Sequence, residues 1–137
     1  MEQQLGGTVK LVHYKGVDVI YNELNGLKDR ELTERLKENA RAMAQTTKNR
    51  RDSVIINDFT DTRFDEDGLK YMKKLHKNLH AFFIACAIVG MKGLQKYIVE
   101  ITEALNKTDF RSKFFDHENE AMDWAVEECK KFANRPR

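Results

Sequence analysis

Cysteines and long apolar runs are scarce in this sequence, and each scarcity excludes a class of protein. The two cysteines, Cys86 and Cys129, form no CxxC pair and have no metal-ligand spacing, so neither a disulfide framework nor a cysteine zinc site is expected. The longest apolar run, residues 81–89, is too short to span a membrane, and the N-terminus lacks the apolar core of a signal peptide. We therefore expect a cytoplasmic protein with reduced thiols and no transmembrane segment.

An excess of charge of one sign is also absent. The chain has 24 basic and 22 acidic residues, and this net charge of +2 is too near neutrality for a general binder of nucleic acid or of membrane surfaces. Local basic clusters are interpreted as the solvated faces and ends of helices. They comprise Lys48, Arg50 and Arg51, and also Lys70, Lys73, Lys74 and Lys77.

Length and composition predict one folded domain. A chain of 137 residues has room for a single hydrophobic core, and its 41% of hydrophobic residues argues against general disorder. We expect the domain to occupy residues 8–133, with flexible termini at residues 1–7 and 134–137.

Two periodicities alternate along the chain and predict mixed α/β architecture. Segments rich in Val, Ile and Tyr flank Lys15-Gly16 and predict an antiparallel hairpin. Amphipathic helical spacing follows, and the uncharged run 81–89 predicts a central strand that is covered on both faces. The expected strands are 8–14, 17–24, 53–59, 81–89 and 111–115; the expected helices are 28–47, 64–79, 93–106 and a last one that buries Ala121, Trp124, Ala125 and Phe132.

The predicted order, ββαβαβαβα, corresponds to a mixed, mostly parallel five-stranded sheet with about four helices. Right-handed crossovers would align the C-terminal ends of the parallel strands along one edge of the sheet. The single proline, Pro136, lies beyond the last helix and interrupts no element.

Three segments resemble the SpoIIAA-like branch of the STAS domains, a family named after sulfate transporters and anti-sigma factor antagonists. They are Val-Ile-Ile-Asn-Asp-Phe at 54–59, Ala-Ile-Val-Gly-Met-Lys-Gly-Leu-Gln-Lys at 87–96, and Phe-Phe-Asp at 114–116 leading to Glu-Ala-Met-Asp-Trp at 120–124. The resemblance covers roughly residues 8 to 130. It implies a STAS-like fold and a protein that docks onto a protein partner in signalling.

The sequence departs from the STAS antagonists at their regulatory turn, which reads Asp-Ser-Ser-Gly and carries the phosphorylated serine. Here the turn reads Asp65-Glu66-Asp67-Gly68, and Asp67 occupies the place of that serine. A kinase-operated switch is therefore not expected. Two interpretations of Asp67 stay open: it stabilises the start of a helix, or it is a fixed mimic of phosphoserine.

Candidate binding residues gather where the chain reverses between strand and helix, because open α/β sheets usually bind ligands at that edge. The turn at 90–93 joins a buried strand to a helix whose free N–H groups favour anions, although two glycines also simply permit a tight turn. Met91 would offer an adaptable apolar contact there. The expected ligand- or partner-binding residues are Asp58, Thr60, Arg63, Asp67, Gly90, Met91, Lys92 and Asp116.

No catalytic, metal or cofactor site is expected. The strands after Asp58 end without the hydroxyl and lysine that a receiver domain needs, and no triad or pair of catalytic carboxylates is present. His76 and His80 have the spacing of a zinc pair but no third ligand, so we expect both at the surface. An enzyme whose groups converge from distant positions stays the third interpretation.

The sequence thus predicts a non-enzymatic STAS-like module for protein–protein docking in signalling or regulation, with which a homodimer would be compatible. The alternative is a carrier of a small apolar ligand or lipid, because related SpoIIAA-like proteins look like lipid-binding domains. Core packing would explain the phenylalanines that could line such a pocket equally well. They are Phe59, Phe64, Phe82, Phe83, Phe114 and Phe115.

Overall fold

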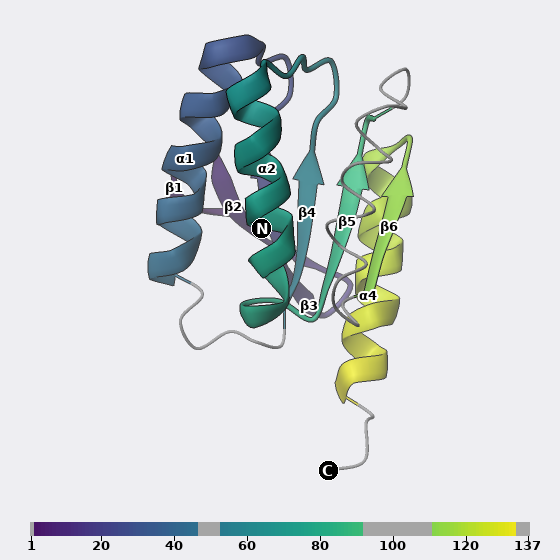
Figure 1. Ribbon diagram of the computed structural model, residues 1–137. Coiled ribbons are helices and arrows are strands. Elements are labelled where there is room, and N and C mark those ends of the chain that lie inside the picture. The colour runs from purple at the N-terminus through teal and green to yellow at the C-terminus, as the bar shows by residue number, and fades with distance from the viewer. Residues whose placement is uncertain (1, 47–52, 92–110, 134–137) are drawn as a thin grey trace.

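The computed structural model describes residues 2–46, 53–91 and 111–133, and these form one six-stranded sheet with helices on both faces (Figure 1). The sheet order is β1-β2-β3-β4-β5-β6; β1 to β3 are antiparallel neighbours, and β3 to β6 run parallel. The strands are β1 (Glu2–Gly6), β2 (Val9–Tyr14), β3 (Val17–Glu23), β4 (Val54–Asp58), β5 (Ala85–Val89) and β6 (Arg111–Phe115). The helices are α1 (Asp29–Thr46), α2 (Glu66–Asn78), the 3-10 turn η1 (Leu79–Ala81) and α4 (Glu118–Ala133).

The hairpin of β2 and β3 forms as its sequence predicts. Tyr14 pairs with Val17, so Lys15 and Gly16 alone make the turn. Both have a positive φ, of 46° and 83°, as a two-residue turn that matches the strand twist requires. This hairpin brings β3 beside β4 and thereby starts the parallel part of the sheet.

The core is split by the sheet into two clusters, and strand alternation decides which side chain joins which. On the face covered by α1 and α2, Ile20, Ile55 and Cys86 pack with helix residues such as Leu36 and Met72. On the face covered by α4, Val19, Val54, Ile56 and Ala85 pack with Ala121 and Ala125. Full burial of a side chain such as Leu36 contributes about 1.5–3 kcal/mol. Because both faces are covered, every residue of β4 and β5 is buried.

The predicted count of five strands is wrong, because residues 2–6 form β1. From the sequence, residues 1–7 are expected to be a flexible terminus. In the structure Glu2, Gln3 and Gln4 are exposed on an edge strand that pairs with β2 through its backbone. Edge strands need no apolar alternation to pair, so hydrophobic patterning does not reveal them.

The helix count cannot be compared along the whole chain, because the helix expected at 93–106 lies outside the described residues. Within the described parts there are three α-helices and η1. The strand expected at 81–89 begins later, at Ala85, because η1 and the turn after it occupy its start. None of the described helices has both the length and the hydropathy that crossing a membrane would require.

Candidate functional site

Asp58, at the end of β4, lies at the expected edge, but its carboxylate is already occupied by neighbouring groups. The hydroxyl of Tyr21 on β3 donates to Oδ2 at 2.6 Å, and the backbone N–H and hydroxyl of Thr60 donate to Oδ1 at 2.9 and 2.5 Å. Only 6% of Asp58 is exposed. Burial and then the Asp58 carboxylate raise the pKa of Tyr21 above its ordinary value, so the phenol keeps its proton. These contacts fix the loop after β4.

Gly90, at the end of β5, lies directly against Thr60. Its φ is +82°, and a Cβ atom added there would lie 2.4 Å from Thr60 Oγ1 and 2.6 Å from Thr60 Cα. The Gly90 N–H donates to the carbonyl of Phe115 at 3.0 Å, so this amide is not available to an anion. Close approach of two loops explains the glycine.

The other residues expected at this edge have different surroundings. Met91 is 2% exposed and belongs to the core cluster, so the expected surface contact at this position is wrong. Met91 thus extends the apolar run of β5 by one residue beyond Gly90. Asp116 is exposed after β6, whereas Lys92 lies outside the described residues.

Arg63 joins the β4–α2 loop to the start of α1. Its guanidinium donates from Nε to both carboxylate oxygens of Asp29 at 3.1 Å and also contacts Asp29 through Nη2. The backbone N–H of Asp29, a residue with a φ of 52°, donates to the Arg63 carbonyl at 2.7 Å. The hydrogen bond from Arg63 lowers the pKa of the Asp29 carboxyl group. Both side chains are largely exposed, so this pair positions a loop without forming a cleft.

Asp67 lies exposed in the first turn of α2, but the residue that caps the helix is Asp65. Asp65 Oδ1 accepts from the Gly68 N–H at 2.7 Å and from the Thr33 hydroxyl of α1 at 3.0 Å. Gly68 allows the two helices to approach, because a Cβ there would lie 2.6 Å from Thr33 Oγ1. Of the expected site residues, therefore, only Asp58, Thr60 and Gly90 are shown in direct contact with one another.

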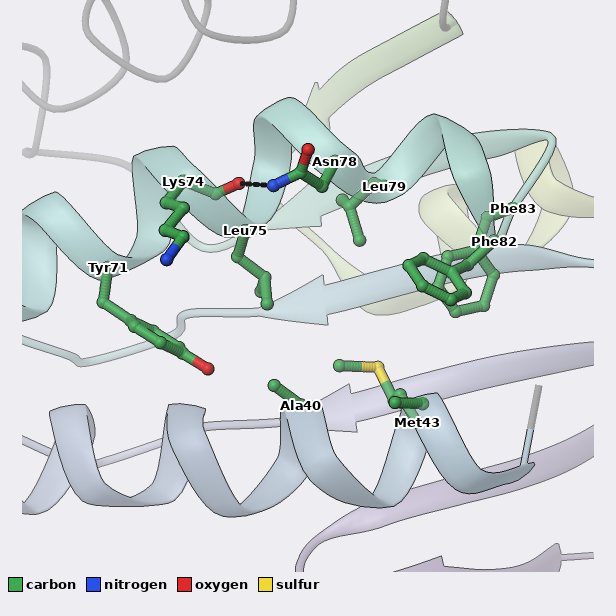
Figure 2. Close-up of a pocket in the computed structure, with 10 residues that line it drawn as sticks. Ala40, Met43, Tyr71, Lys74, Leu75, Asn78, Leu79, Phe82 and Phe83 are labelled. Atoms are coloured by element: carbon green, nitrogen blue, oxygen red, sulfur yellow. Dashed lines mark hydrogen bonds between the residues drawn. The ribbon is translucent and has the colours of Figure 1, made fainter. Parts of the chain in front are cut away.

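An apolar pocket lies elsewhere, between α1 and α2 (Figure 2), and sequence reasoning missed it. Its volume is about 190 Å³. Ala40 and Ala44 leave room opposite the larger side chains of α2, and this pair of small residues one helical turn apart was the available signal. The lining residues are Ala40, Met43, Ala44, Tyr71, Lys74, Leu75, Asn78, Leu79, Phe82 and Phe83.

The two ends of the pocket differ chemically. The amino group of Lys74 and the hydroxyl of Tyr71 lie at one end, and Phe82 and Phe83 lie at the other (Figure 2). Phe82 is 38% exposed at the rim, whereas Phe83 is 4% exposed. Asn78 uses one N–H of its side-chain amide to donate to the Lys74 carbonyl at 3.0 Å.

The six phenylalanines expected around an apolar pocket therefore divide into separate groups. Phe82 and Phe83 line the pocket, and Phe83 also belongs to the core cluster in which Phe59 and Phe64 pack together with ring centroids 5.3 Å apart. Phe114 packs against the same core cluster. Phe115 lies on the opposite face of the sheet against Trp124.

His76 is buried beneath α2 and is 1% exposed, so its expected place at the surface is wrong. Its Nδ1 lies 2.9 Å from the carbonyl of Met72, which can only accept, so Nδ1 carries the proton. Nε2 then accepts from the Asn57 side-chain amide at 3.1 Å. Burial lowers the pKa of His76 to about 4, which keeps the ring neutral. With both nitrogens engaged, His76 is not free to bind a metal.

A chain of buried amides continues from Asn57 across the sheet to α1. Asn22 donates to Asn57 Oδ1 at 2.9 Å, and Asn39 of α1 donates to Asn22 Oδ1 at 2.7 Å. Asn39 also donates to the Thr8 hydroxyl and accepts from the Thr8 N–H. Within the described residues, no buried side-chain nitrogen or oxygen lacks a partner. A fully satisfied network of this kind fixes the positions of α1 and α2 over the sheet.

The fold is that of a SpoIIAA-like α/β domain. Among solved structures, the chain is similar to the crystal structure of an uncharacterized protein of the DUF3478 family, with a SpoIIAA-like fold, from Shewanella loihica PV-4. The TM-score is 0.62 at 20% sequence identity, over 91% of this chain and 98% of that one. The SpoIIAA-like fold implied by the sequence resemblance is thereby confirmed. No family model matches the chain, and neither does any curated protein.

Proposed function

We propose that this chain is a non-enzymatic STAS-like binding module that binds a small apolar ligand in the pocket between α1 and α2. The observation that carries the proposal is the pocket itself, about 190 Å³ in volume and lined by side chains such as Met43, Leu75 and Phe83. Drug-sized ligands occupy roughly 300–1,000 Å³, whereas a cavity of about 150 Å³ can hold benzene. The pocket therefore suits one aromatic ring or a short hydrocarbon chain.

The choice of the α1–α2 pocket over the strand-end edge as the binding site is supported by the state of the polar groups at that edge. Asp58 and Gly90 have their polar groups engaged within the fold, and Met91 is buried. The absence of a catalytic role and a cytoplasmic location are parts of the same proposal. They rest on composition and on the lack of a catalytic motif in the sequence.

A neutral probe tests the proposal directly. Titration of 3-phenylpropanol into the labelled protein, followed by two-dimensional NMR, should shift the backbone amides of Ala44, Leu75 and Leu79. Ala40→Phe fills the pocket and should abolish these shifts, whereas Ala133→Phe, at the exposed end of α4, should leave them unchanged. Ala44→Leu serves as a milder filling variant if Ala40→Phe unfolds. Absence of binding, or equal binding by the filled variants, would contradict the proposal.

Protein docking, which the sequence resemblance implies, is the second candidate, and one observation favours it. Phe82 exposes 38% of its surface at the rim of the pocket, and exposed aromatic anchors are typical of interfaces. A displayed peptide library selected on the protein should then give sequences that lose binding to Phe82→Ser. Sedimentation velocity on the same two proteins would show whether the partner is a second copy of the chain.

A further inference from the structure

The Tyr71 end of the pocket carries positive charge contributed by both helices. Lys74 of α2 lines the pocket, and Lys37 of α1 places its Nζ 6.0 Å from the centroid of the Tyr71 ring. The Tyr71 ring, which itself lines the pocket, therefore has a cation from α1 nearby. Among the described residues, no acidic side chain lines the pocket to balance these charges.

Neither of these two lysines has a partner acid among the described residues, whereas several other cations do. Lys10, Lys15, Arg63 and Arg111 each form an ion pair, as does Lys70 with Glu66. Within residues 2–46, 53–91 and 111–133, neither Lys37 nor Lys74 has an ion pair, and the Tyr71 hydroxyl has no hydrogen-bond partner. The pocket thus offers an ammonium group and a phenol as free donors beside apolar walls.

We propose that the ligand is a small monocarboxylate whose apolar part is a single aromatic ring or a short hydrocarbon chain, with its carboxylate held by Lys74 and Tyr71. This inference rests on the proposed pocket function and adds the charge of the ligand. The apolar part would lie among the side chains of Leu75, Met43 and Phe83, which also line the pocket.

Charge and hydrogen bonding select the carboxylate over the corresponding alcohol or amine. A carboxylate accepts hydrogen bonds from both the ammonium and the phenol, and charge-assisted bonds of this kind are stronger than neutral ones. An alcohol of the same size fills the pocket equally but gains no ion pair. An amine would place a cation beside Lys74 and Lys37, and this repulsion weakens its binding.

The experiment compares 3-phenylpropanoate, 3-phenylpropanol and 3-phenylpropylamine by the same NMR titration. The acid should bind about fivefold to tenfold more tightly than the alcohol, and the amine most weakly. Lys74→Met keeps most of the apolar stem but removes the charge, so it should bring the acid to the affinity of the alcohol. Lys70→Met, one turn away and paired with Glu66, is the matched control and should retain the preference. Salt raised from about 0.05 M to about 0.5 M should reduce the preference.

The outcomes separate the two proposals. If acid and alcohol bind equally to the wild type, or if Lys74→Met retains the preference, the carboxylate inference is wrong while the apolar pocket stands. If none of the three probes binds, the pocket function itself fails. Thermal unfolding of Lys74→Met and Lys70→Met checks that both variants are folded before their binding titrations are interpreted.

Discussion

The strand-end edge and the α1–α2 pocket use polar groups in opposite ways. At the edge, Asp58, Thr60 and Gly90 engage one another or nearby backbone, and the carboxylate is buried. At the pocket, the Lys74 ammonium group and the Tyr71 hydroxyl have no polar partner within the described residues, and Phe82 is partly exposed. A polar residue at a favoured position in the topology is therefore weak evidence for binding. A donor that no other protein group occupies, placed beside apolar surface, is stronger evidence.

The largest expected effect comes from adding a methyl group at Gly90, where the loop after β5 contacts Thr60 of the loop after β4. Gly90→Ala should lower the free energy of unfolding by about 3 kcal/mol, because the methyl group adds backbone strain at positive φ and overlaps Thr60. Gly16→Ala is the control, with a φ of +83° but no atom within 4 Å of the added Cβ. It should cost about 1 kcal/mol. Urea unfolding measures both, and equal losses would show that the loops do not pack closely.

The second effect concerns the buried amide network beneath α2. The pKa of His76 is about 4 in the folded protein against 6.5 for the free side chain, so the unfolded chain binds the proton first. Stability from neutral His76 is complete above pH 6.5 and is lost as the pH falls toward 4. Between about pH 7.5 and about pH 5 the loss should be about 2 kcal/mol.

Urea unfolding at the two pH values, on wild type and His76→Gln, isolates this contribution, because other groups titrate alike in both proteins. The pH-dependent loss should be smaller in His76→Gln by that amount. His117→Gln changes an exposed histidine and should retain the full loss. An unchanged loss in His76→Gln would mean that His76 is not held neutral by burial.

Sequence patterning predicted the order of the elements well but not which polar residues the fold would engage. The continuous apolar run at residues 85–89 and the position of Asp58 at a strand end follow from local sequence. Tyr21, which donates to Asp58, is 37 residues away, so no local motif reveals that the carboxylate is occupied. His76 and His80 have the spacing of a zinc pair, but His76 is buried and its Nε2 accepts from Asn57 of β4, a contact that no local motif indicates.

The pair of small residues on α1 was a sequence signal, but it could not establish the pocket for a related reason. Ala40 and Ala44 belong to the apolar stripe that the helix pattern indicates. Such a stripe does not show whether side chains of α2 fill the space beside these two small residues. The free volume depends on how α2 lies over α1, which Gly68 and Thr33 set at the far end of the helix. Packing distances of this kind are a property of the tertiary structure.

The third expected effect tests the helix start near the edge. Asp65→Ala removes the cap that accepts from Gly68 N–H and the contact with Thr33, and should cost about 1 kcal/mol. Asp65→Asn keeps an acceptor oxygen and should recover much of that stability. Thermal unfolding of the two variants measures the difference. Equal losses would indicate that the charge of Asp65, and not its capping hydrogen bond, stabilises α2.

The smallest effect is expected at Asp67, in the turn where this sequence departs from the STAS antagonists. It decides whether Asp67 stabilises the start of a helix or mimics a phosphoserine. Asp67 is exposed and is not the cap, so Asp67→Asn loses only a favourable charge near the helix N-terminus, worth a few tenths of a kcal/mol. Tyr71 follows one turn later, so removing this negative charge should not weaken binding of 3-phenylpropanoate. Glu66→Gln, in the same turn but paired with Lys70, is the control.

A phosphoserine mimic at Asp67 would instead be required for partner recognition. On that interpretation, a peptide selected on the wild type should bind Asp67→Asn at least tenfold more weakly. The thermal stability of Asp67→Asn should be unchanged, and Glu66→Gln should bind the peptide as the wild type does. Equal affinity for all three proteins would show that Asp67 is a helix-stabilising residue.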